Sequence, residues 1–233
     1  MGSEEFEFIM KEKDNIKGPN KPMEWANYLL IVSGRKEEEY SYYVKKEKKY
    51  QNAPKIESFL EKINSLFANQ LPTGYKFDLP TEAQWEYACK AGTEKNFVDI
   101  DEVAWYKGNN GNTKSKDYGD KNRDVLLLCA AHDVGQKKPN AWGIYDMLGN
   151  VSELCKDFYA DYPTEAVTDP INVFKISFKN NGKSTVFDHP WGVTRGGNYD
   201  CSASLCRSTA RSPEPPRNNI FGVGFRLALV PVD

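Results

Sequence analysis

The first clear hydrophobic pattern along the chain predicts an amphipathic helix over residues 54–67. Its apolar positions recur every three or four residues and therefore share one face: Ile56, Phe59, Leu60, Ile63 and Leu66. Pro54 suits the first turn of a helix, where its missing N–H group would have no partner in any case. We expect this helix to end at about Phe67, ahead of Pro72 and Gly74.

A second helix is predicted over residues 81–91, and here the signals are at its ends. Thr81 can accept a hydrogen bond at the N-terminus while Gln84 reaches back, which is the arrangement of a capping box. Gly92 suits the left-handed conformation that ends many helices. We expect Trp85, Ala88 and Cys89 to share the buried face, with Cys89 as a core thiol.

The rest of the chain predicts short strands and long irregular connections. Residues 173–178 and 184–187 flank Asn180-Asn181-Gly182, which is typical of a hairpin turn. Residues 222–232 alternate as a terminal strand does, whereas residues 108–124 have the Gly, Asn, Asp and Lys content of an exposed loop. Together these features indicate an α+β domain that is rich in coil.

Composition and charge narrow the class of protein. The 233 residues are 39% hydrophobic, which is enough for one core with long loops. With 31 basic and 33 acidic residues the net charge is −2, so we expect no nucleic-acid partner. No apolar run approaches the roughly 18 residues of a membrane span, and the N-terminus lacks the layout of a signal peptide. A leader removed upstream would fit the same sequence, so localisation stays open.

Five cysteines are spaced unevenly along the chain: Cys89, Cys129, Cys155, Cys201 and Cys206. An odd number at such spacing does not form a complete disulfide framework. We therefore expect at least one thiol to be free or to bind a ligand.

Several separated motifs point to one protein family. In chain order they are Gly18-Pro19-Asn20-Lys21-Pro22-Met23-Glu24, residues 79–88 (LPTEAQWEYA), residues 134–153 (VGQKKPNAWGIYDMLGNVSE), Arg195-Gly196-Gly197-Asn198-Tyr199 and Gly224-Phe225-Arg226. In this order they resemble the formylglycine-generating-enzyme-like, or sulfatase-modifying-factor, family. The resemblance covers about residues 5–231.

The resemblance implies a fold and a domain organisation. The fold is α+β, namely the coil-rich C-type-lectin-like fold of the formylglycine-generating-enzyme type. We expect residues 5–231 to form a single domain of this kind. Family members usually begin with a further strand segment, so the domain is expected to be shortened at its N-terminus, and residues 1–4 to be a cloning remnant.

The resemblance also implies a copper chemistry. In formylglycine-generating enzymes two cysteines after the Gly-Gly-Ser-Tyr motif hold copper(I), which activates oxygen to oxidise a sulfatase cysteine. Cys201 and Cys206 fall in matching places, and paired thiolates are ligands that copper(I) prefers. They are the catalytic residues if the chain is such an oxidase.

A binding function is the preferred alternative. Asn198 replaces the family's serine, and the segment after Cys206 is shorter than in the enzymes and resembles family members without an established oxidase activity. A contact or disulfide between Cys155 and Cys206 would also remove one copper thiolate. We therefore predict a non-catalytic domain that binds a protein or peptide ligand, as in the diversified proteins of retroelements. Its predicted surface comprises Asn198, Tyr199, Asp200, Ser202, Ser204, Arg207, Arg211 and Arg217.

A calcium site is the last expectation that the resemblance gives. The positions that match the family's calcium loop are Asp146, Gly149, Val151 and Glu153. Two carboxylates around a glycine turn, with carbonyl oxygens between them, suit the flexible oxygen shell of calcium. The alternative is a helix that begins at Asp146 and leaves Glu153 exposed.

Overall fold

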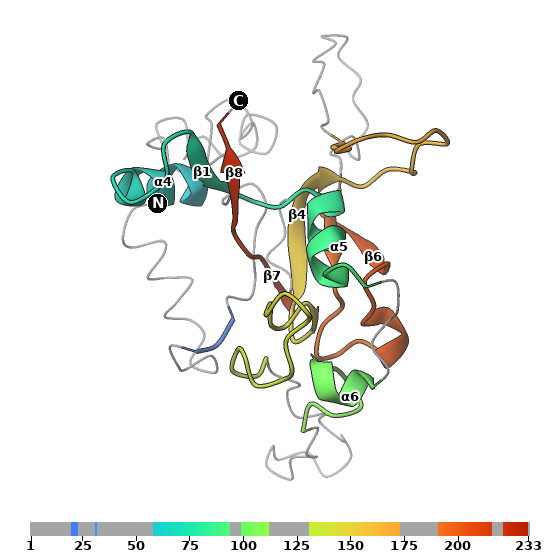
Figure 1. Cartoon of the computed structure of the whole chain (residues 1–233). Helices are drawn as coiled ribbons and strands as arrows, with labels where there is room; N and C mark the ends of the chain where they lie inside the picture. Colours follow the sequence, from blue (N-terminus) through green and yellow to red (C-terminus); the bar gives the residue numbers. More distant parts are fainter. Residues whose placement is uncertain are drawn as a thin grey trace, which may run out of the picture. The chain divides into compact units, whose positions relative to one another are not determined.

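Short helices and strands separated by irregular chain make up the computed structural model (Figure 1). The structure describes residues 20–22, 31, 58–93, 99–111, 131–172, 191–215 and 221–232. The chain divides into two compact units. One contains residues 1–17, 27–78 and 227–233, and the other residues 18–26 and 79–226. The predicted hairpin at residues 173–187 and most of the predicted loop at residues 108–124 lie outside the described residues.

The first unit contains a helix and a pair of strands. Helix α4 (Phe59–Phe67) is the predicted first helix, but it begins at Phe59 instead of Pro54. Ser58 is its N-cap and forms a capping box with Glu61, which fixes the start of the helix at that point. Strands β1 (Tyr75–Asp78) and β8 (Ala228–Pro231) pair antiparallel.

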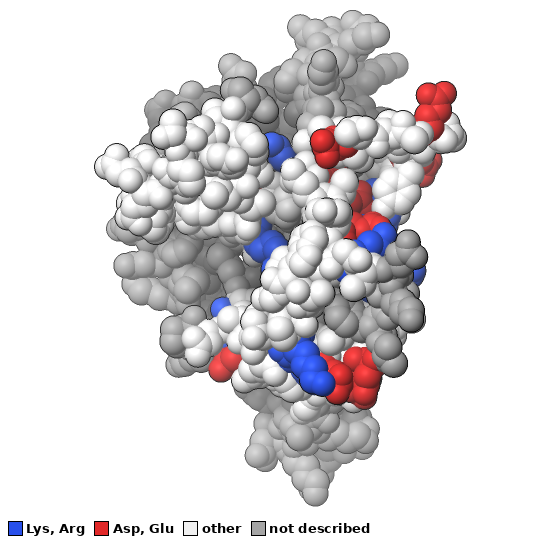
Figure 2. Space-filling view, in the orientation of Figure 1, with Lys and Arg blue, Asp and Glu red and all other residues white. Residues whose placement is uncertain are grey.

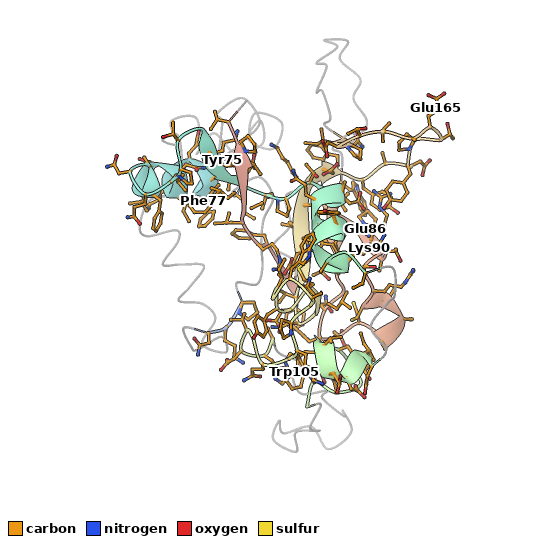
Figure 3. All side chains as sticks on the ribbon, in the orientation of Figure 1. Tyr75, Phe77, Glu86, Lys90, Trp105 and Glu165 are labelled. Carbon is orange, nitrogen blue, oxygen red and sulfur yellow. The ribbon has the colours of Figure 1, made fainter. Side chains whose placement is uncertain are left out.

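Asn64 joins helix α4 to strand β1. Its side-chain amide donates to the carbonyl of Phe77 at 2.8 Å, and its side-chain oxygen accepts from the Phe77 N–H at 2.7 Å. The rings of Phe67 and Phe77 meet edge to face with centroids 6.1 Å apart. The helix is therefore held to its strand by a polar and an aromatic contact, and Phe77 is labelled in Figure 3.

The second unit is built on a four-stranded sheet in the order β6-β5-β4-β7. The strands are β4 (Ser152–Phe158), β5 (Gly192–Arg195), β6 (Arg211–Glu214) and β7 (Val223–Gly224). Strand β5 runs antiparallel to β4 and β6, whereas β7 runs parallel to β4. Strand β4 is buried along most of its length, as a central strand with both faces covered should be.

Helix α5 (Glu82–Lys90) packs against β4 and β5. It is the predicted second helix, and its capping box is confirmed because Thr81 and Gln84 each bond the other's backbone N–H. Trp85 and Cys89 are buried. The left-handed stop begins one residue earlier than predicted, at Ala91 with φ 48°, and continues at Gly92.

The connections around the sheet contain further short elements. Helix α6 (Ile100–Val103) leads into β2 (Ala104–Trp105), which pairs parallel with β3 (Leu148–Gly149). A turn of 3-10 helix, η2 (Ala203–Leu205), lies between β5 and β6. The main core of this unit consists of Trp85, Cys89, Val103, Ala104, Met147, Leu148, Cys155, Val193 and Cys206.

The predicted single strand at residues 222–232 is divided in two. Residues 223–224 pair with β4 in one unit, and residues 228–231 pair with β1 in the other. Between them Arg226 leaves the ladder and turns its side chain to a carboxylate of β4. Alternation along a sequence cannot reveal such a change of partner.

Candidate functional site

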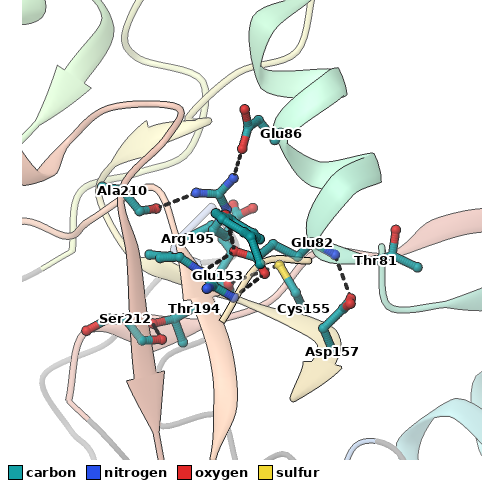
Figure 4. A network of polar contacts seen from close by, with 12 residues as sticks. Thr81, Glu82, Glu86, Glu153, Cys155, Asp157, Thr194, Arg195, Ala210 and Ser212 are labelled. Carbon is teal, nitrogen blue, oxygen red and sulfur yellow. Dashed lines mark hydrogen bonds and ion pairs between the residues drawn. The ribbon is translucent and has the colours of Figure 1, made fainter. Parts of the chain in front are cut away.

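A network of arginine–glutamate pairs joins helix α5 to the sheet (Figure 4). The side chain of Arg195, on β5, is completely buried. It donates to Glu86 of α5 and to the carbonyl of Ala210 at 2.8 Å, and its Nε lies 3.4 Å from a carboxylate oxygen of Glu82. A buried guanidinium is tolerated only when its charge is paired in this way.

The environment of Glu86 favours its charged form. Burial alone would raise the pKa of this carboxyl, but a hydrogen bond from Lys90 and the charges of Arg195 and Lys90 outweigh burial and lower the pKa. Glu86 and Lys90 lie one helical turn apart on α5, as Figure 3 shows. The glutamate is therefore held as a carboxylate in the native protein.

Arg211, on β6, forms a bidentate pair with the other glutamate of this helix. Its Nε and one Nη lie 2.7 and 2.6 Å from the two oxygens of Glu82. The guanidinium also lies over the rings of Tyr159 and Tyr162, each at 4.3 Å. Although Arg211 was predicted to belong to a ligand-binding surface, its donors are engaged within the fold.

Glu153, on β4, is the third carboxylate with an arginine partner, and like Glu82 it is buried. It accepts from Arg226 through both oxygens, at 2.5 and 2.6 Å, and from the indole N–H of Trp85 at 2.7 Å. Glu153 is thus in a strand and buried, which excludes the alternative of a helix with this residue exposed.

The other expected calcium ligands, Asp146, Gly149 and Val151, precede Glu153 in the chain. Asp146 is half-buried with φ 55° and accepts the N–H of Gly135 at 2.7 Å. Burial raises the pKa of Asp146. Gly149 and Val151 are buried. Among the described residues no group of three or more His, Cys, Asp or Glu side chains could hold a metal ion.

Of the four expected ligands, Glu153 is not free to bind calcium as it stands. Both oxygens of Glu153 are already occupied by charged or polar N–H donors. A metal ion would have to displace Arg226 before this carboxylate could ligate it. Calcium binding stays a prediction.

The loop between β5 and β6 carries most of the predicted ligand-binding surface. Its exposed residues are Asp200, Ser202, Ser204, Leu205, Arg207 and Thr209. Asn198 is half-buried and uses its amide within the fold, bonding Gly222 at 3.3 Å and the N–H of Asp200 at 3.0 Å. Tyr199 is fully buried, so its ring belongs to the core and not to this surface. Arg217 lies outside the described residues.

Asn110 and His132, which lie outside the motifs, connect this loop to the rest of the unit. The side chain of Asn110 donates to the carbonyl of Tyr199 at 2.5 Å, and a ring nitrogen of His132 lies 3.1 Å from the carbonyl of Asn110. The His132 ring is stacked on Trp105 at 3.8 Å; Trp105 is labelled in Figure 3. Sequence reasoning missed Asn110 because it lies far from Tyr199 in the chain, within a segment that predicts only a loop.

Cys206 belongs to the core of the second unit, and Cys201 packs against that core. Burial, and to a smaller extent the charge of Cys201, raise the pKa of Cys206 to about 12. Cys206 is buried, Cys201 is only partly buried, and the four described cysteines are free thiols. Cys155 belongs to the same core as Cys206, but the expected contact between them stays a prediction.

The rim of the loop carries charges of both signs. Lys107 and Asp200, each about half exposed, lie 3.4 Å apart. On the face shown in Figure 2, described Lys and Arg residues lie among Asp and Glu residues and form no extended basic patch. No helix among the described residues is long and apolar enough to cross a membrane.

Comparison with known proteins gives a consistent family match. The model of the Sulfatase-modifying factor enzyme 1-like domain matches residues 19–230. The formylglycine-generating enzyme of Mycobacterium tuberculosis is 30% identical over 163 residues, which cover 66% of this chain and 51% of that protein. The chain spans about half or less of the length of the curated relatives it matches.

Two solved structures are similar to this chain. PvdO from Pseudomonas aeruginosa superposes with a TM-score of 0.51 at 21% identity, over 91% of this chain and 63% of that one. Treponema denticola variable protein 1 is 31% identical, covers 65% of this chain and 47% of that one, and gives a TM-score of 0.44. The similarity to PvdO supports the predicted coil-rich α+β fold of the formylglycine-generating-enzyme type.

Proposed function

Because the chain belongs to the family of the Sulfatase-modifying factor enzyme 1-like domain, we propose that it is a non-catalytic member that binds a protein or peptide ligand. The binding surface is the loop of residues 200–209, between strands β5 and β6. Within this family the finer assignment is a diversified, retroelement-type variable protein.

The observation that carries the proposal is the pattern of burial in this loop. Exposed side chains alternate with anchored positions, since Tyr199, Cys206, Ser208 and Ala210 are buried. Backbone hydrogen bonds of 2.9–3.1 Å close successive turns at Cys201, Leu205, Cys206 and Ala210. The exposed side chains can therefore change without disturbing the backbone, which is what a recognition loop on a rigid scaffold requires.

The exposed side chains suit a protein or peptide partner. Leu205 is 48% exposed in the middle of the loop. Around it lie the charges of Asp200 and Arg207 and the hydroxyls of Ser202 and Ser204. An apolar centre with a polar rim is the usual composition of a protein–protein contact.

A displayed random-peptide library tests this function. Peptides enriched on the wild-type protein should bind a Leu205→Asp/Arg207→Glu variant at least about tenfold more weakly, a loss of about 1.4 kcal/mol. The matched control is Tyr87→Ser, which changes a side chain that is 67% exposed on helix α5. Peptides that bind the loop variant as well as the wild type, or lose binding to the control, would contradict the proposal.

A copper-dependent formylglycine-generating oxidase is the second candidate. It is favoured because Cys201 packs against the core that contains Cys206, and two thiol donors are a suitable set for copper(I). Bound copper(I) would supply oxygen activation for oxidation of a sulfatase cysteine. The partly buried Cys201 would face the substrate while the buried Cys206 completes the donor pair.

Turnover decides between the two candidates. We expect no formylglycine from a Cys-x-Pro-x-Arg peptide in the presence of copper and oxygen. Copper-dependent turnover that disappears in both Cys201→Ser and Cys206→Ser variants would establish the oxidase instead.

A further inference from the structure

The loop of residues 146–153 contains the carboxylates of Asp146 and Glu153. An arginine of the same chain lies against Glu153. Glu153 is 5% exposed. A buried carboxylate in this position is stable only if a positive charge or several hydrogen bonds compensate for the lost water.

Arg226 is the group that contacts the carboxylate of Glu153. Its Nε and one Nη contact the two oxygens of Glu153, and the same Nη donates to the carbonyl of Tyr145 at 3.1 Å. The guanidinium therefore compensates the charge of Glu153 and bonds a main-chain carbonyl.

We propose that Arg226 replaces a calcium ion in this loop, so that the 146–153 segment folds without metal. The guanidinium supplies the positive charge beside Glu153 and bonds both of its oxygens, so the contacts that calcium would make to this carboxylate are already taken. Trp85 adds a third hydrogen bond to Glu153, so each carboxylate oxygen already has a donor without an ion. The inference is independent of the ligand-binding function.

Trp85 also provides a direct probe. Its indole nitrogen lies 2.7 Å from Glu153, so a terbium ion bound there would be excited through the tryptophan. We expect the wild-type protein to show no saturable terbium luminescence, and its melting temperature to be the same in calcium and in chelator. A saturable signal that calcium displaces, or a melting temperature lowered by chelator, would overturn the proposal without any need for a variant.

Substitution of Arg226 gives the complementary test. Arg226→Gln should lower the melting temperature, and millimolar calcium should restore part of the loss because the carboxylates are then free to ligate it. The matched control is Arg211→Gln, which breaks another bidentate pair, at Glu82. It should also lower the melting temperature but gain no response to calcium. A folded Arg226→Gln protein that is as stable as the wild type, or that calcium does not stabilise, would contradict the proposal.

Discussion

Two regions of this protein use arginine in opposite ways. Arg195 and Arg211 frame the loop after β5 and are paired with glutamates of helix α5, with side chains 0% and 15% exposed. Arg207 lies between them in the chain but is exposed, and it bonds only its near neighbours Ser204 and Thr209. The same residue type is thus part of the scaffold where a carboxylate faces it, and part of the exposed loop surface where no described carboxylate does.

The difference shows how the exposed positions of this loop can change without loss of stability. Breaking a buried ion pair costs much more than the pair itself contributes, because an uncompensated charge remains. An exposed arginine keeps its water and contributes little to folding. We therefore expect changes to be tolerated at the exposed positions between the two framing arginines but not at the arginines themselves.

The largest effect is expected for Arg195→Met. This substitution leaves Glu86 and Glu82 without their buried partner, so the free energy of unfolding should fall by about 3–5 kcal/mol. For a chain of this size that corresponds to about 10 °C in melting temperature. Chemical denaturation measures the free energy of unfolding, and thermal denaturation measures the melting temperature. The matched control, Arg207→Met, should be within about 0.5 kcal/mol of the wild type. Equal losses in the two variants would remove the distinction between scaffold and surface.

The next effect is expected for Gly149→Ala in the scaffold. Gly149 has φ +70°, and a Cβ there would collide with the backbone of Trp105. Gly143 has a similar φ of +77° but open space around it, so Gly143→Ala carries the left-handed strain alone. We expect a loss of about 1 kcal/mol for Gly143→Ala and about 3 kcal/mol for Gly149→Ala. Equal losses in urea denaturation would show that Trp105 does not approach this glycine closely.

A smaller, pH-dependent effect is expected at Glu86. Its pKa is lower in the native protein than in the unfolded chain, so its ion pairs stabilise the fold above its unfolded pKa. That stability is lost as the pH falls through the lowered native pKa. The difference in unfolding free energy between the wild type and Glu86→Gln should therefore be largest near neutral pH and should disappear in acid. For the exposed pair of Glu102 and Lys138, Glu102→Gln should change stability little at any pH.

The smallest effect on the fold is expected from alkylation of Cys201. This thiol is only partly buried, whereas Cys206 and Cys89 are buried with pKa values raised to about 12. Because thiolates are the reactive form, iodoacetamide should modify Cys201 at least about tenfold faster than either of them at mildly alkaline pH. Peptide mapping by mass spectrometry measures the order, and unfolded protein should show no such preference. Preferential labelling of Cys206 would mean that the loop is open in solution.

The sequence by itself determined the features that depend on neighbouring residues. Helix α5 and its capping box follow from Thr81 and Gln84, because a cap needs only groups within one turn. The same holds for the existence of helix α4, although its start was placed too early because Ser58 and Glu61 were not recognised as a capping box. The ordered motifs also predicted the family and the coil-rich α+β fold.

Only the tertiary structure decided which partner each group meets across the chain. It paired Arg195 and Arg211 with α5, Arg226 with Glu153, and the backbone of Tyr199 with Asn110. It also divided the C-terminal segment between two sheets. These contacts join residues far apart in sequence, and a charged or aromatic residue carries no local signal of whether a partner will bury it. For that reason the residues of the loop surface could be listed from the sequence, but those committed to the core could not be separated from those exposed.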